Sequence, residues 1–110
     1  MIRVTIYKTA RHEYVGFDLS GHAGYAESGQ DIVCAAVSAL VINAVNSLER
    51  FTDDETSCTA NEETGDIELR FAGSPSHDAA LLLDSMILGL EEIEDSNEYE
   101  QYIDIIFKEV

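Results

Sequence analysis

Hydrophobic and polar residues alternate along two pairs of segments in the pattern of β-strands. Residues 2–9 and 14–20 place apolar side chains at every second position, with a short polar turn between them, so we expect them to pair as an antiparallel hairpin. Residues 56–62 and 66–72 are more polar strand candidates. They are joined by residues 63–65, whose Thr-Gly sequence suits a short turn and predicts a second hairpin.

The remaining apolar residues predict two helices and one more strand. Residues 32–51 carry apolar side chains on more than one helical face, which predicts a long, largely buried helix capped by Asp31. A second helix is predicted to begin with Pro75 at its first position and to extend through Ile93. Apolar residues alternate again over residues 102–110, which predicts a last strand.

The order of these elements, ββαββαβ, predicts an α+β fold. We expect a two-layer sandwich in which a mostly antiparallel sheet is packed by two helices. A chain of 110 residues with 45% hydrophobic residues suits one compact domain, residues 1–110, because it supplies apolar material for a single modest core.

Charge is distributed unevenly and limits the kind of partner. Residues 1–50 contain four Lys or Arg against five Asp or Glu, so residues 51–110 hold −15 of the net charge of −16. So acidic a surface repels phosphate backbones, which argues against nucleic-acid binding, and it attracts basic proteins or peptides. Solubility alone is the other explanation. We expect no membrane span and a cytoplasmic protein, because the chain opens directly into a strand pattern and lacks a targeting segment.

A glycine-rich loop lies between a histidine and a cysteine, and this arrangement is typical of a thiol-nucleophile site. Cys34 follows the predicted start of the first helix, where exposed amides and the helix dipole stabilise a thiolate, and His22 supplies a base. Gly21, Gly24 and Gly29 are the hinge that admits a peptide.

Other chemistries fit the same loop less well. The spacing from Gly24 to Gly29 is that of a phosphate loop, but Gln30 and Asp31 stand where Lys and Ser or Thr are required. The histidines and cysteines lack the spacing of a zinc site, and there is no Gly-x-Ser-x-Gly elbow of a serine hydrolase. The two cysteines are expected to be free thiols, and without a neighbouring resolving cysteine a redox protein is disfavoured.

Each candidate residue also has a purely structural interpretation. Cys34 is alternatively a small buried hydrophobe, and His22 a solvated residue at the end of a strand. Asp31 suits a helix cap better than a catalytic acid, because its charge works against a thiolate. Ser38 lies one turn after Cys34, where its hydroxyl either bonds a thiol or bonds back to the helix carbonyl at position 34.

The loop and the helix start resemble the signature of a known family, the ribosomal-processing cysteine proteases called Prp. The residues that carry this resemblance are Gly21-His22-Ala23-Gly24, Gly29, Asp31-Ile32-Val33-Cys34-Ala35-Ala36 and Ser38. The resemblance is specific within residues 21–40, and outside them it rests on length and element order.

The resemblance implies a function, a mechanism and partners. It implies a homodimeric protease that removes the short N-terminal extension of the basic ribosomal large-subunit protein numbered twenty-seven, with no metal or cofactor. Carried over to this sequence, Cys34 is the nucleophile and His22 the general base and acid. The alternative is a non-catalytic acidic protein that binds a basic ribosomal protein or assembly factor through its C-terminal half, with Cys34 only packing.

Overall fold

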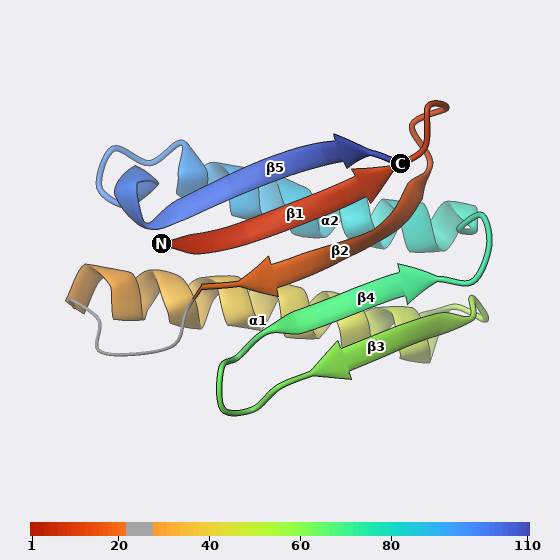
Figure 1. The fold of residues 1–110 in the computed structure, drawn as a ribbon, viewed down its shortest axis with the longest axis horizontal. Coiled ribbons are helices and arrows are strands. Elements are labelled where there is room, and N and C mark those ends of the chain that lie inside the picture. Colours follow the sequence, from red (N-terminus) through yellow and green to blue (C-terminus); the bar gives the residue numbers. More distant parts are fainter. Residues whose placement is uncertain (22–27) are drawn as a thin grey trace.

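The strands of the two predicted hairpins and the last predicted strand form one five-stranded sheet (Figure 1). The structure, a computed structural model, describes residues 1–21 and 28–110. Its elements are β1 (Ile2–Lys8), β2 (Tyr14–Ser20), α1 (Ser28–Phe51), β3 (Thr56–Ala60), β4 (Ile67–Phe71), α2 (His77–Glu94), the 3₁₀ turn η1 (Glu100–Tyr102) and β5 (Ile103–Glu109). The predicted order of elements and both hairpins are confirmed.

The strands lie in the order β3-β4-β2-β1-β5. Every neighbouring pair is antiparallel except β1 and β5, which run parallel. The parallel pair arises because β5 enters the sheet from α2, a crossover connection, and not from a tight turn. The mostly antiparallel sheet of an α+β fold is therefore confirmed.

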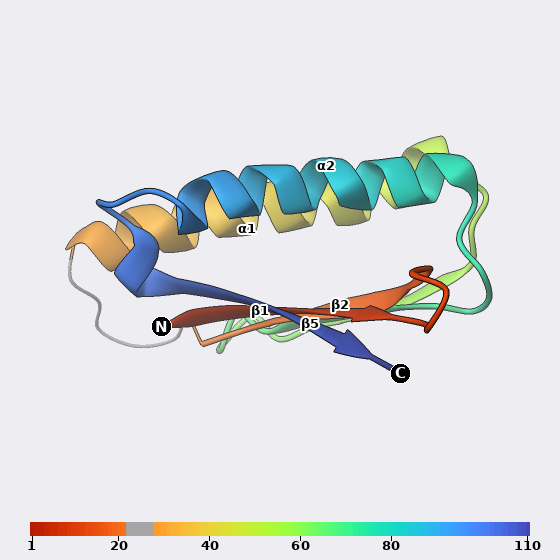
Figure 2. The ribbon, with the colours of Figure 1, turned by 90° about the horizontal axis from the view of Figure 1, so that it is seen from above.

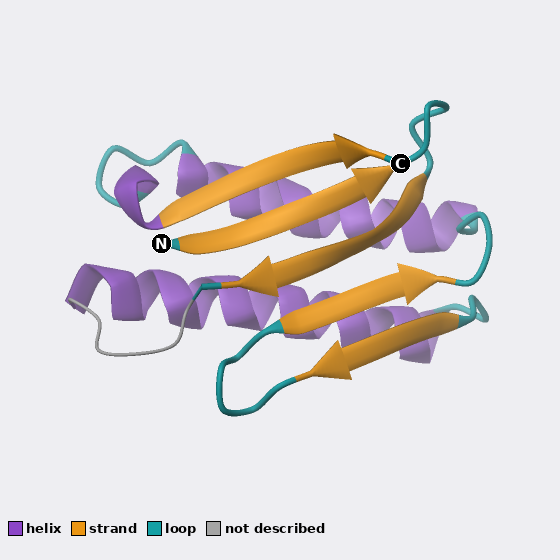
Figure 3. Ribbon diagram, viewed as in Figure 1, coloured by secondary structure: helices purple, strands orange, loops and turns teal. Residues whose placement is uncertain are grey.

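Both helices cover the same face of the sheet, and the opposite face carries no helix within the described residues (Figures 2 and 3). Every second strand residue points toward the helices and is buried, because strand side chains alternate between the two faces of the sheet. With one stripe of each helix they form the core, whose largest fully buried members are Phe17, Ile2, Ile6, Leu19, Leu48, Leu69, Leu83 and Leu90.

The first helix is amphipathic, so the prediction of a largely buried helix was wrong. Its buried residues form one stripe: Val33, Val37, Val41, Ala44 and Leu48. Ile32 and Ile42 lie on other faces and are 55% and 48% exposed. One sheet face can cover only one stripe of a helix, whatever the apolar content of the other faces. The stretch Ile32–Phe51 is long and apolar enough to cross a membrane. Core helices of globular proteins meet the same criteria of length and composition.

Both helix starts differ from the prediction. The helix α1 begins at Ser28, so Asp31 lies inside its first turn and is not the cap. Serine is itself typical of helix starts, and an acidic residue in the first turn of a helix is favourable toward the helix dipole.

The helix α2 begins at His77 and not at Pro75, because Ser76 is its cap. The Ser76 hydroxyl oxygen accepts a hydrogen bond from the backbone N–H of Ala79 at 3.1 Å. Ser76 also donates from its backbone N–H and its hydroxyl to the two carboxylate oxygens of Asp54, at 2.7 and 2.6 Å. This contact joins the chain after α1 to the start of α2, and it lowers the pKa of Asp54.

The uncovered sheet face is held by a polar cluster of Tyr7, Asp18 and Arg70. The Arg70 guanidinium donates to Asp18 at 2.8 Å and lies 4.5 Å from the centre of the Tyr7 ring, and the Tyr7 hydroxyl donates to Asp18 at 2.6 Å. Partial burial raises the pKa of Asp18, but the hydrogen bonds from Arg70 and Tyr7 outweigh it and leave the pKa below its usual value. The cluster therefore ties three adjacent strands together through one carboxylate.

We predict that Asp18→Asn lowers the free energy of unfolding at pH 7 by about 1–2 kcal/mol, because it weakens two hydrogen bonds to a carboxylate that is 24% exposed. A depressed native pKa gives stability that is present above the unfolded value of about 3.9 and is lost as pH falls through the native value. The difference between variant and wild type should therefore shrink below about pH 4, as measured by urea unfolding across pH.

The matched control for this prediction is Asp104→Asn on the same sheet face. Asp104 lies 3.8 Å from Arg3 in a pair that is well exposed on both sides, so its removal should change stability by less than about 0.5 kcal/mol. A difference at Asp18 that persists undiminished at about pH 2.5 would show that the substitution disturbs packing and not a charge.

Candidate active site

Cys34 lies at the boundary between the buried and the exposed faces of α1. The side chain is half-buried and packs against the hydrophobic core, beside the fully buried Val33. It is the seventh residue of α1, nearly two turns from the first, and not at the helix start as predicted. Because the dipole effect falls off within the first turn, the helix terminus acts on Cys34 less than the sequence suggested.

Gly21 fixes the point at which the chain leaves the sheet before the glycine-rich loop. Its φ is +90°, a conformation that favours glycine. A Cβ at this position would lie 2.3 Å from the carbonyl oxygen of Met1, so no other residue fits without a shift of the backbone. The turn that ends β2 therefore requires glycine at this position, and the predicted role of Gly21 in the hinge stays a prediction.

Some of the remaining predicted site residues lie within the described part of the chain and others do not. His22 and Gly24 lie outside the described residues, and their predicted roles stay predictions. Gly29 and Asp31 lie in the first turn of α1. Ser38 is half-buried one turn after Cys34 on the same side of α1, and its predicted hydrogen bond also stays a prediction.

The two histidines within the described residues belong to the β1–β2 turn and to the first turn of α2, and both of these segments lie at the opposite end of the molecule from the start of α1 (Figure 1). His12 lies in the turn after β1, whose seven residues separate it from the Gly21 end of the sheet by roughly 23 Å. His77 follows Ser76, which binds Asp54 just beyond the end of α1. Phe51, at that end, follows Cys34 by 17 residues, or about 25 Å along the helix. Neither histidine is in reach of Cys34.

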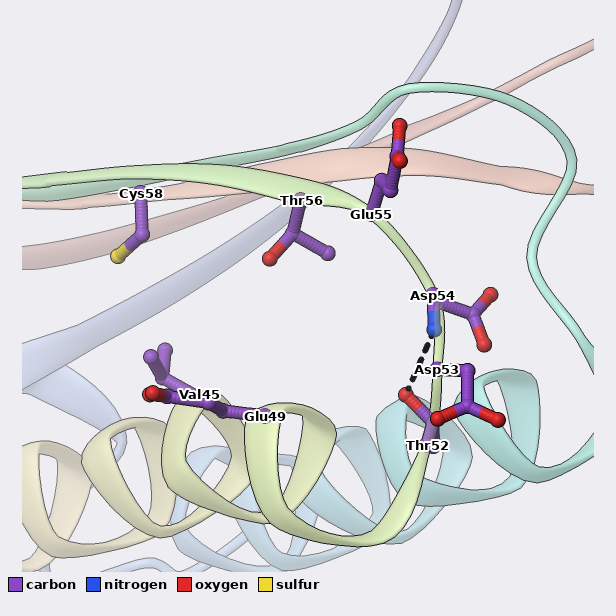
Figure 4. A pocket seen from close by; sticks show the side chains of 8 residues that line it. All are labelled: Val45, Glu49, Thr52, Asp53, Asp54, Glu55, Thr56 and Cys58. Carbon is purple, nitrogen blue, oxygen red and sulfur yellow. Dashed lines mark hydrogen bonds between the residues drawn. The ribbon is translucent and has the colours of Figure 1, made fainter.

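Cys58 lines an acidic cavity of about 600 Å³ between β3 and the C-terminal part of α1, and its side chain points toward the helix (Figure 4). The carboxylates of this cavity belong to Glu49, Asp53, Asp54 and Glu55. Desolvation raises the pKa of the Cys58 thiol, which disfavours the reactive thiolate. No histidine lines the cavity, and within the described chain no three His, Cys, Asp or Glu side chains are grouped to hold a metal.

The two cysteines are well separated. Val45, which lines the same cavity as Cys58, follows Cys34 by eleven residues, or about 16 Å along the helix axis. A disulfide requires the two Cα atoms to lie within about 7 Å, so these thiols do not pair with each other. Cys34 lies in the half of α1 that follows the glycine-rich segment, whereas Cys58 lies on β3.

One feature of this region had no signal in the sequence. Ser38 and Ile42 of α1, with the β3–β4 turn, line a small and mostly apolar cavity. The turn residues are far from α1 in the sequence, and their polar composition indicates only a hairpin loop. The fold alone brings this turn to the side of the helix that carries Cys34.

A half-buried thiol on a core helix, next to a loop whose sequence carries His22, is the arrangement expected of a thiol peptidase. The family model of cysteine protease Prp matches residues 1–104. The chain therefore belongs to the Prp family of cysteine proteases.

Several known proteins are similar along most of this chain. It is 37% identical to the ribosomal processing cysteine protease Prp of Bacillus subtilis over 86% of this chain and 88% of that protein. It is 30% identical to the protein of the same name from Staphylococcus aureus over 98% and 100%. The crystal structure of the Staphylococcus aureus protease in complex with a substrate peptide matches with a TM-score of 0.90 at 29% identity, again over 98% and 100%. A second structure, with a covalently linked product peptide, matches with a TM-score of 0.86 at 30% identity over the same shares.

We predict that Gly21→Ala destabilises the protein by about 1–3 kcal/mol, because it combines a disfavoured φ with a clash against the Met1 carbonyl. Urea unfolding measures the change. Gly73→Ala is the control, because a Cβ at Gly73 would meet no atom within 4 Å and the residue lacks a positive φ, and it should stay within about 0.5 kcal/mol of wild type. Equal effects of the two substitutions would contradict the constraint at Gly21.

Proposed function

We propose that this protease removes the short N-terminal extension of the ribosomal large-subunit protein numbered twenty-seven and so supports ribosome assembly. The observation that carries the proposal is the placement of Cys34, half-buried on α1 beside the glycine-rich segment, in a chain that matches the Prp family along its length. The relatives from Bacillus subtilis and Staphylococcus aureus are named as ribosomal processing proteases, which supports this substrate class.

In the proposed mechanism, His22 takes the proton of the Cys34 thiol and the sulfur attacks the carbonyl carbon of the scissile peptide bond. The bond to the leaving amine then breaks, and His22 returns the proton to that amine. Water, activated by His22, hydrolyses the thioester and frees Cys34. The distance of His12 and His77 from Cys34 supports His22 as the base, because the chain has three histidines. The reaction needs no metal or cofactor.

The backbone offers donors for the oxyanion that forms during the attack. The first four N–H groups of an α-helix have no acceptor within the helix, and in α1 these belong to residues 28–31. We propose that they stabilise the oxyanion. In this proposal Asp31 contributes its backbone N–H from this first turn and does not act as a cap, and Gly29 adds no side chain beside these donors.

The charge distribution supports a basic partner. Most of the acidic side chains follow residue 50, and three of these, together with Glu49, line the cavity beside Cys58. A basic ribosomal protein is attracted by such a surface, which raises its rate of encounter, whereas nucleic acid is repelled. We place the protein in the cytoplasm, where ribosomes assemble. We also propose a homodimer, which the exposed Ile42, Leu81 and Leu88 of the helix layer support as apolar contact residues.

We predict that Cys34→Ala lowers kcat/KM for the extended ribosomal protein by at least about 10³-fold, because the substitution removes the nucleophile. Mass spectrometry of the substrate measures processing, and circular dichroism checks that the fold is retained. An alkylating reagent at neutral pH should label Cys34 well before Cys58, whose thiol pKa is raised by desolvation. Normal processing by the variant would contradict the assignment.

A second prediction concerns the base. Loss of a positioned general base lowers rates by about 10²–10⁴-fold, so His22→Ala should be nearly inactive in the same assay. His12→Ala and His77→Ala are matched controls at exposed histidines and should retain wild-type activity. An inactive His77→Ala variant with an intact fold would show that another histidine is the base.

A further inference from the structure

The strand β5 forms one edge of the sheet, and its sequence favours pairing with other strands. It is the last strand in the order, and within the described residues it pairs only with β1 (Figure 1). Residues 103–107, Ile-Asp-Ile-Ile-Phe, have four large β-forming side chains and a single charge. A segment of this kind on an open edge is a site of unwanted strand pairing. The other edge strand, β3, is shorter and contains only small residues, Thr-Ser-Cys-Thr-Ala.

Backbone hydrogen bonds show which amides of β5 point away from the sheet. The N–H of Val110, just after the strand, donates to the carbonyl of Lys8 in β1 at 2.8 Å. The N–H of Ile105 donates instead to the side chain of Glu94 at 2.8 Å. Successive amides of a strand point to opposite sides. The N–H groups of Ile105 and Phe107 therefore point outward, and those of the even-numbered residues point toward β1.

Glu94 is the last residue of α2, and its carboxylate lies against the outer edge of β5. Its side chain is half-buried, whereas the neighbouring Glu92 and Asp95 are exposed. A carboxylate oxygen that accepts from a backbone N–H makes a charge-assisted hydrogen bond, which is stronger than a bond between neutral groups. Another strand cannot use the N–H of Ile105 unless this bond is broken. Glu94 therefore occupies the position that a neighbouring strand would take.

A second copy of this chain is the partner that fits the edge. Two β5 strands can pair antiparallel about a two-fold axis with Ile105 opposite Phe107 of the second copy, because both residues present their backbone groups outward. The same register places Asp104 opposite Lys108 of the second copy and brings the two Ile106 side chains together. Opposite charges and β-branched side chains are both favourable cross-strand pairs. A shift of one strand by two residues would place Lys108 opposite Ile106 and lose the charge pair.

We infer that the outer edge of β5 is a pairing surface for a second copy of this chain, and that Glu94 keeps it closed. The second copy and Glu94 compete for the same N–H of Ile105, so only one of them binds it. The core needs the apolar residues of this strand, because Ile103 is buried and Ile105 packs against the core. In the proposed homodimer each subunit has one such edge, so open edges would join dimers into longer assemblies.

The test is Glu94→Ala, with Glu92→Ala as the matched control. Each substitution removes one carboxylate from α2, but Glu92 is exposed and lines the groove between the two helices, away from β5. Light scattering over a concentration series at fixed salt measures the mass. Glu94→Ala should reach at least twice the wild-type mass at concentrations about 10–100-fold lower than wild type, because no charge-assisted hydrogen bond has to be broken first. Glu92→Ala should stay within about 3-fold of wild type.

A second substitution shows where the larger assembly forms. Phe107→Pro removes an outward N–H, so it costs no bond to β1, and proline does not fit between two paired strands. Combined with Glu94→Ala, it should return the protein to the wild-type mass. Amide hydrogen exchange in dilute Glu94→Ala should be at least about 10-fold faster than wild type at Ile105. The amide of Ile106, which points toward β1, should keep its protection and so report an intact strand.

Each outcome decides the inference. A wild-type mass for Glu94→Ala, with fast exchange at Ile105, overturns the pairing surface, and unchanged exchange at Ile105 overturns the closure. Equal growth in Glu94→Ala and Glu92→Ala also overturns it, because the loss of negative charge then explains the assembly. Growth that persists after Phe107→Pro is added places the contact elsewhere and overturns it too. Growth that is specific to Glu94→Ala and is reversed by Phe107→Pro supports the inference.

Discussion

The packing of one sheet face against a single stripe of α1 is the constraint on which the site depends. Val33, Val37 and Val41 are almost completely buried under the sheet. Successive residues of a helix are rotated by about 100°, so this stripe fixes the orientation of every other side chain on α1. Cys34 and Ser38 follow Val33 and Val37 by one residue and are thereby held half-buried at the edge of the core, where Ser38 lines the cavity beside the β3–β4 turn.

The same constraint separates the two thiols and gives them different surroundings. Cys34 is supported by the core at the end of the molecule where β2 leads into the glycine-rich segment. Cys58 lies on an edge strand above the C-terminal part of α1, among carboxylates. A negative surrounding and desolvation both disfavour a thiolate. One long helix under the sheet thus places a supported thiol at one end and an acidic cavity at the other.

Two polar contacts connect elements whose relative positions the hydrophobic core alone does not fix. Asp18 joins three strands through Tyr7 and Arg70 on the uncovered face. Asp54 binds the cap of α2 and fixes the chain that follows α1. Both carboxylates have lowered pKa values because they accept hydrogen bonds, so these two contacts depend on ionised acids. The hydrogen bonds stabilise negative charges that would otherwise add to the repulsion among the carboxylates of this acidic chain.

The sequence by itself determined the element order, both hairpins and the last strand, because alternation and turn residues are local signals. It also identified Cys34 and His22 as candidates, since their types and the glycines between them lie within one short segment. Tertiary structure decided the rest. The sheet covers only one stripe of α1, Ser76 caps α2 through a bond that Asp54 reinforces, and the pocket beside Ser38 is made of segments that lie far apart in the chain. No local pattern reports these contacts, because each depends on which distant side chain the fold brings alongside.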